Sequence, residues 1–202
     1  IDSYQGQNVV FLLEQDQFLR DQYLVAPELQ SRFYAAAARN GEEISFERGL
    51  VNIGLHIRRG DIVTSPSTGS DNLKMRWQDD LYFERALQHV IEGLDGRPYA
   101  VFLFSQGEPQ QFANFTDDKA LRLCLDMGPR ESFLHMCKAD ILITSKSSFS
   151  YKPALLNQGI KICPGGFWHG YPDLPEWIVA NDDGTFDIDR LRSVVSRSLP
   201  AR

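Results

Sequence analysis

Short apolar runs alternate with amphipathic segments along most of the chain. Apolar runs of strand length, rich in β-branched and aromatic residues, predict buried strands, which we place at residues 51–55, 99–104, 121–125, 140–144 and 160–163. Residues 81–94 carry apolar side chains at three-to-four spacing, which is typical of an amphipathic helix. Further helices are predicted at residues 27–39, 109–115, 131–138 and 149–157, with Gly159 as the cap of the last.

This alternation of strands and helices predicts an α/β fold: a Rossmann-like, mostly parallel sheet flanked by helices on both faces. We expect residues 51–202 to form this domain and residues 1–50 to be a helical remnant of another domain with a hinge. Within the remnant, an apolar run from Val9 continues at helical spacing to Tyr23. Residues 62–76 show no periodicity and predict a long polar loop.

Composition and charge narrow the classes of function. The chain is 43% hydrophobic and 24% charged, as in a globular protein with a core, and its apolar runs are far shorter than the ~20 residues of a membrane helix. A net charge of −6 argues against a general nucleic-acid surface, so an anion site has to be local and built from a few arginines. Because the chain opens on Ile1 without a signal peptide, we interpret it as an excised segment whose flanks could hold a targeting or anchoring element.

The three cysteines and the histidines give little chemical signal. Cys124, Cys137 and Cys163 lack metal-type spacing, and we expect buried free thiols rather than a disulfide. We interpret His89 and His135 as structural or surface residues. The sequence contains no metal-ligand spacing, Walker loop, dinucleotide glycine fingerprint or nucleophile elbow.

The most informative stretch is residues 51–61, where an apolar strand runs into His56, Arg58, Arg59 and Asp61. Open α/β sheets bind ligands at the carboxyl ends of their strands, and a guanidinium matches the geometry of phosphate oxygens. One arginine would therefore contact a diphosphate while Asp61 holds the loop. The alternative is a solvated turn in which Arg58 and Asp61 pair, and the position after a buried strand puts the two interpretations on an equal footing.

A second candidate is the hydroxyl-rich turn at residues 144–150, which opens a predicted helix. Backbone N–H groups at a helix N-terminus, beside Ser147, Ser148 and Ser150, could cradle a phosphate. Plain N-capping by Ser147 or Ser148 is the alternative, and the stretch alone favours it. Because both candidate stretches follow parallel strands, both would open on the same edge of the sheet.

Two less specific candidates complete the predicted site. Gln106 and Glu108 follow the strand at 99–104 and could read a base or ribose edge, although a solvated turn is equally compatible. His169 lies in an aromatic loop that could border an acceptor site or serve as hydrophobic cover.

Residues 56–61, with the sequence His-Ile-Arg-Arg-Gly-Asp, resemble the His-x-Arg-Arg-Gly-Asp motif of the GDP-fucose-dependent fucosyltransferases, and are most similar to the α-1,2 type. Later stretches resemble this family in the same order, at residues 80–86, 101–105, 133–143 and 147–151. The resemblance covers about residues 52–163, and the ordered set is more specific than any one piece.

The resemblance implies the C-terminal, donor-binding half of a GT-B glycosyltransferase, with residues 1–50 as the tail of the acceptor-side domain. It implies transfer of fucose from GDP-fucose to a glycan hydroxyl with inversion, without a metal or another cofactor. Arg58 would contact the β-phosphate as the catalytic residue, and His56 would lie near the guanosine. Ser148 and Ser150 would complete the phosphate cradle, with Phe149 in the same donor site.

The implied partners are a nucleotide-sugar donor and a glycan acceptor, with no nucleic acid and with a membrane only through segments absent from this chain. The compartment would be the Golgi lumen for a eukaryotic member and the cytoplasm for a bacterial or viral one. The chain departs from the family at Gln106-Gly107, where an acidic pair is common and Glu108 is the substitute, and at Tyr151, which replaces a tryptophan. Two alternatives stay open: a GT-B transferase using another nucleotide-sugar donor, and a non-catalytic nucleotide- or glycan-binding module.

Overall fold

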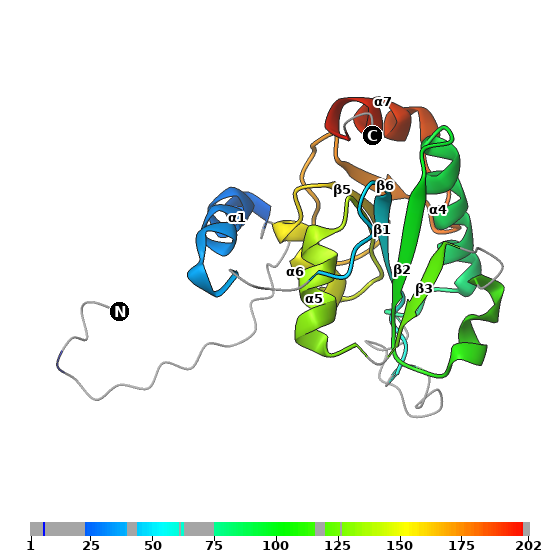
Figure 1. Cartoon of the computed structure of the whole chain (residues 1–202), viewed down its shortest axis with the longest axis horizontal. Coiled ribbons are helices and arrows are strands. Elements are labelled where there is room, and N and C mark those ends of the chain that lie inside the picture. Colours follow the sequence, from blue (N-terminus) through cyan, green and yellow to red (C-terminus); the bar gives the residue numbers. More distant parts are fainter. Residues whose placement is uncertain are drawn as a thin grey trace.

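The structure is a computed structural model, which describes Gly6 and residues 23–39, 44–60, 62, 75–115, 120–125 and 127–199. In this part of the chain six strands form one parallel sheet (Figure 1), namely β1 (Val51–His56), β2 (Tyr99–Phe104), β3 (Leu121–Cys124), β4 (Ile141–Ile143), β5 (Ile160–Pro164) and β6 (Trp177–Ala180). The strand order is β3-β2-β1-β4-β5-β6. That order is the doubly wound, Rossmann-like one, so the predicted fold class is confirmed.

Helices cover both faces of the sheet. The helices are α1 (Ala26–Ala35), α4 (Asp80–Gly93), α5 (Pro129–Lys138), α6 (Ser148–Leu156) and α7 (Ile188–Ser198), with short 3-10 turns η3 (Ala37–Arg39) and η4 (Pro109–Phe115). Along β2, Val101 and Leu103 pack in the core layer under α4 and α7, whereas Phe102 and Phe104 pack in the layer under α5 and α6. This period-two alternation makes a three-layer arrangement with a core on each side of the sheet (Figure 1).

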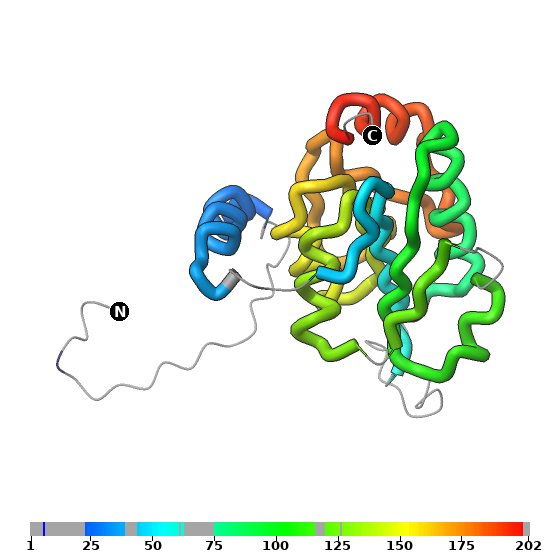
Figure 2. Tube along the Cα trace, in the orientation of Figure 1, coloured from blue at the N-terminus to red at the C-terminus, as the bar shows by residue number. Residues whose placement is uncertain are grey.

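Helix α1 lies at the side of this body, next to the α5 and α6 layer (Figure 2). The Tyr34 hydroxyl donates hydrogen bonds to the carbonyl oxygens of Cys137 (3.0 Å) and Leu156 (3.1 Å). The Gln30 side chain donates another to the carbonyl of Leu155 at 2.8 Å. These bonds join α1 to the C-terminal ends of α5 and α6.

Several predicted elements need correction. The predicted helix at 27–39 is divided at Ala36, which is extended, into α1 and η3, and the segment at 109–115 is a 3-10 turn. Gly159 does not cap α6, which ends at Leu156 with Asn157 as its C-cap residue. Gly159 is needed there because a Cβ would lie 2.3 Å from the carbonyl oxygen of Asp140. Strand β6 and helix α7 were not predicted, and the prediction for residues 9–22 lies outside the described residues.

The cysteines are free, but only Cys137 and Cys163 are buried as expected, whereas Cys124 is partly exposed. Among the helices that the structure describes, none has both the length and the apolar character required to cross a membrane.

Candidate functional site

The loop after β1 and the turn after β4 meet at the carboxyl edge of the sheet. Strand β1 lies between β2 and β4, so the chain order reverses here, and crevices at such reversals are where α/β sheets bind ligands. The His56 ring joins the two segments directly, because its Nδ1 lies 2.8 Å from the Ser145 hydroxyl. The structure thus brings the two sequence-predicted stretches together.

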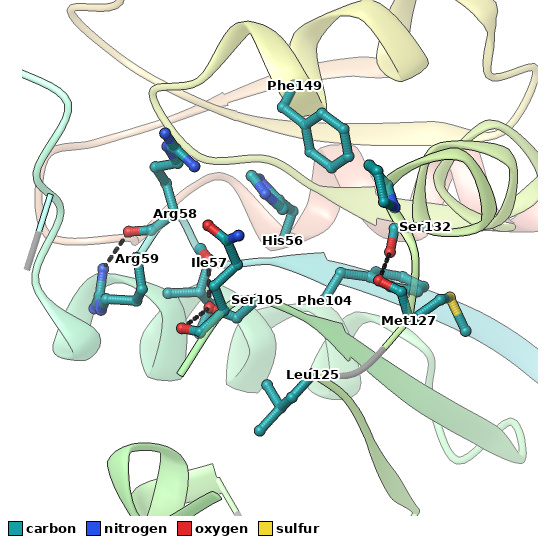
Figure 3. Close-up of a pocket in the computed structure, with 12 residues that line it drawn as sticks. His56, Ile57, Arg58, Arg59, Phe104, Ser105, Leu125, Met127, Ser132 and Phe149 are labelled. Carbon is teal, nitrogen blue, oxygen red and sulfur yellow. Dashed lines mark hydrogen bonds between the residues drawn. The ribbon is translucent and has the colours of Figure 1, made fainter. Parts of the chain in front are cut away.

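A cavity of about 320 Å³ opens beside this junction (Figure 3). Its size is at the lower end of the range typical of small-molecule sites. Its walls come from the segments after β1, β2 and β3 and from the first turns of α5 and α6. The apolar part consists of Ile57, Phe104, Leu125, Met127, Pro129 and Phe149, and the polar part of His56, Arg58, Arg59, Ser105, Gln106 and Ser132. In Figure 3 the two arginines lie at one end of the group and Met127 and Ser132 at the other.

His56 is a buried, neutral residue of this cavity. Only 4% of it is exposed, and burial, with a smaller contribution from the Arg58 charge, lowers the pKa of the imidazole from 6.5 to about 3. Its ring lies 5.5 Å from that of Phe149, centroid to centroid. A neutral imidazole has one donor and one acceptor nitrogen, and here Nδ1 is engaged by Ser145.

The two adjacent arginines have different surroundings. Arg59 is 7% exposed, forms an ion pair with Asp80 at the start of α4, and donates a 2.9 Å hydrogen bond to the carbonyl oxygen of Arg58. Its guanidinium also lies 4.4 Å from the centroid of the Trp77 ring. Arg59 therefore ties the loop to α4. Arg58 is partly buried, and Figure 3 shows its side chain on the same side of the β1 end as Phe149.

The loop is tight where it passes Gln106. Gly60 has a φ of +80°, and a Cβ at this position would lie 2.3 Å from the Gln106 carboxamide oxygen. Gln106 therefore lies against the arginine loop and lines the cavity. Glu108 is exposed and is not among the cavity residues, and its backbone N–H bonds to the Gln111 side chain. Asp61 lies outside the described residues.

The serines of the turn after β4 have different contacts. Ser147 is the N-cap of α6, because its hydroxyl accepts a hydrogen bond from the Phe149 N–H at 3.2 Å. The Ser150 hydroxyl is fully buried and donates to the carbonyl oxygens of Ser145 and Ser147 at 3.3 Å each, so it holds the turn. The Ser148 hydroxyl lies 3.3 Å from Nε2 of His169. N-capping, the alternative favoured for this stretch, is thus what Ser147 does.

The remaining histidines are part of the packing. His135 is buried, its Nδ1 lies 2.9 Å from the carbonyl oxygen of Glu131, and its Nε2 lies 3.0 Å from the Ser45 N–H nitrogen. His169 is 2% exposed and its ring stacks on Tyr151 with a centroid distance of 4.2 Å. Within the ranges that the structure describes, no three His, Cys, Asp or Glu side chains cluster as metal ligands.

Sequence reasoning missed the wall formed by Leu125, Met127, Pro129 and Ser132. One signal was available, since these residues follow β3, whose carboxyl end lies at the same sheet edge as those of β1 and β2. Ser145 was also missed as the partner of His56, because a contact between residues 89 positions apart has no local signature.

Comparison with known proteins adds no assignment. No protein-family model matches the chain, and no curated protein matches it. The function is therefore argued from the geometry of the site and from the residues that resemble fucosyltransferase motifs.

Proposed function

We propose that this chain is the donor-binding half of a GT-B glycosyltransferase that transfers fucose from GDP-fucose to a glycan hydroxyl. The observation that carries the proposal is the cavity at the carboxyl ends of β1, β2 and β3, which combines apolar and aromatic walls with Arg58. Such walls suit a flat nucleobase, and a guanidinium suits a diphosphate. The choice of guanine and fucose comes from the resemblance of residues 56–61 and the later stretches to fucosyltransferases.

In the proposed reaction the oxygen of the acceptor hydroxyl attacks C1 of fucose from the face opposite the diphosphate. The bond between C1 and the β-phosphate oxygen breaks, its electron pair leaves with GDP, and the configuration at C1 inverts. The hydroxyl proton passes to a base that we place with the acceptor-side domain. GDP thus gains negative charge in the transition state, and charge that develops there is what a fixed cation stabilises best.

Arg58 is the residue to which we assign this stabilisation. Arg58 lines the cavity and follows the carboxyl end of β1. Strand β1 lies at the switch point of the Rossmann-like sheet. The α6 N-terminus adds partial positive charge from its backbone N–H groups. His56, held neutral by burial, would contribute shape and the link to Ser145 rather than charge. Gln106 is the better placed of the two candidates for reading the base, because it lines the cavity and Glu108 does not.

Calorimetric titration with GDP, ADP and UDP in parallel tests the proposal. We expect a preference for GDP, and Arg58→Ala should weaken GDP binding by about tenfold or more, since a hydrogen-bonded charge contributes about 1.5–3 kcal/mol. Its melting temperature should stay near that of the wild type. Arg85→Ala is the matched control, because this exposed arginine of α4 pairs with Asp183 and is not a cavity residue.

Each result has a defined meaning. Preference for ADP or UDP would keep a nucleotide site and reject fucose as the donor sugar, and absence of binding to all three would contradict the proposal. If Arg58→Ala unfolds the domain, the result would favour the alternative that Arg58 only holds the turn together and does not bind the nucleotide. Transfer of labelled fucose from GDP-fucose to a glycan then separates an enzyme from a binding module, which binding alone does not do.

A further inference from the structure

Arg76 is a partly buried cation that lacks a compensating charge within the part of the chain that the structure describes. Its Nε is buried without a hydrogen-bond partner, and no acidic side chain of the described ranges forms an ion pair with it. The contrast with Arg59 is direct, because Arg59 is neutralised by Asp80. Leaving a buried guanidinium N–H without a hydrogen-bond partner costs free energy, so this arginine calls for an explanation.

The contacts of Arg76 and its neighbours place it between the two halves of the site. On one side, the Arg76 guanidinium carbon lies 5.1 Å from the centroid of the Trp168 ring. The next residue, His169, contacts Ser148 at the first position of α6. Arg76 thus contacts the residue that precedes His169 in the chain, and it is not itself one of the residues that line the cavity.

On the other side, the residues that follow Arg76 are fixed to the site. Trp77 packs under the Arg59 guanidinium at 4.4 Å. The Gln78 carboxamide oxygen accepts a 2.7 Å hydrogen bond from the backbone N–H of Lys146, in the turn after β4. The two residues after Arg76 therefore contact the arginine loop after β1 and the serine turn after β4, at the switch point of the sheet.

We propose that Arg76 supplies a second guanidinium to the anionic ligand of this switch point. In the function proposed above, on which this inference rests, that ligand is the diphosphate of the nucleotide. In the proposed role, the Arg76 guanidinium lies over the Trp168 ring and donates N–H groups to phosphate oxygens. Residue 76 lies between the stretches at 56–61 and 80–86 that resemble the fucosyltransferases and in neither of them, so the resemblance assigns it no role.

The test compares guanosine with GDP as ligands of the wild type, Arg76→Met and the control Arg85→Met. Arg76→Met should weaken GDP binding about tenfold and leave guanosine binding unchanged, because guanosine has no phosphate. Arg76→Lys, which keeps the charge, should recover part of the loss. The melting temperature of ligand-free Arg76→Met should equal or exceed that of the wild type, because the substitution removes an uncompensated charge.

Two results of the titrations with GDP and guanosine would overturn the inference. One is a GDP affinity of Arg76→Met within about twofold of the wild type. The other is an equal loss for guanosine and GDP with a lower melting temperature, which would mean that Arg76 only supports Trp168. If the wild type binds neither GDP nor guanosine, the proposed function fails, and titration with inorganic pyrophosphate decides Arg76 separately. Pyrophosphate binding that Arg76→Met weakens would support the anion role, and its absence in the wild type would reject both.

Discussion

Acidification should destabilise this protein at its candidate site, because His56 has to take up a proton on unfolding. The unfolded chain binds that proton near pH 6.5, whereas burial holds the pKa of His56 in the folded protein near 3. Between these two values the unfolded state binds more protons, so the free energy of unfolding falls as the pH is lowered. At pH 4.5 this one residue should account for a loss of about 2–3 kcal/mol relative to neutral pH.

Urea unfolding of the wild type and of His56→Gln at pH 7 and pH 4.5 measures this effect. Glutamine keeps a polar group toward Ser145 but does not titrate, and the other ionisable groups contribute equally to both proteins. At pH 7 the variant should be the less stable, because it loses the ring contact with Phe149. The difference should shrink by about 2–3 kcal/mol at pH 4.5. A difference that stays constant between the two pH values would refute the reasoning, since His56 would then titrate alike in both states.

Three further predictions concern the loop, the core and the reaction. Gly60→Ala should lower the free energy of unfolding, measured in urea, by about 1–2 kcal/mol, because residue 60 has a positive φ. The substitution should also weaken nucleotide binding, because the added Cβ displaces Gln106. Unchanged stability would contradict this prediction and show that the loop relaxes. Burial lowers the pKa of Lys161 to about 8, so stability should rise with pH between about 8 and 10.5 in the wild type relative to Lys161→Met, and parallel curves would contradict this. Excess chelator should leave fucose transfer intact, and a strict requirement for a divalent ion would reject the metal-free mechanism.

The sheet was predictable because parallel strands covered on both faces read as continuous apolar runs. Of the strands that were predicted, β2 and β4 are apolar throughout, whereas Asn52, Arg122 and Lys161 interrupt β1, β3 and β5. Strand β6 carries such a run as well, from Trp177 to Ala180, so this signal was available in the sequence and was missed. Helix α7 buries Leu191, Val194 and Val195, an apolar stripe at helical spacing that was available in the sequence and was missed. Its cap was a usable signal, since Asp187 accepts hydrogen bonds from the N–H groups of residues 189 and 190.

Within the site, the sequence predicts which loops share an edge of the sheet, but not which of their side chains face the cavity. That the loops after β1 and β4 open on the same edge follows from a parallel sheet, which the alternation of elements predicts, whereas the pairing of β1 with β4 was not predicted. Whether Gln106 or Glu108 faces the cavity depends on the turn geometry after β2, and whether Ser148 or Ser150 is buried depends on the phase of α6. The apolar wall around Met127 was missed because apolar residues carry no chemical signature, although they form much of the cavity.

The arginines show why the surroundings of a charge matter more than its place in a motif. A pair such as Arg58-Arg59 suggests that both residues bind one ligand. Arg59, however, forms an ion pair with Asp80 and lies over the Trp77 ring, so its charge stabilises the loop. Arg76 has no motif around it, yet it lies over the Trp168 ring and no acidic residue that the structure describes neutralises it. In a chain with a net charge of −6, an anion is attracted only where positive charge is left uncompensated. Charge compensation therefore separates Arg59, which builds this site, from Arg76, which we propose binds its ligand.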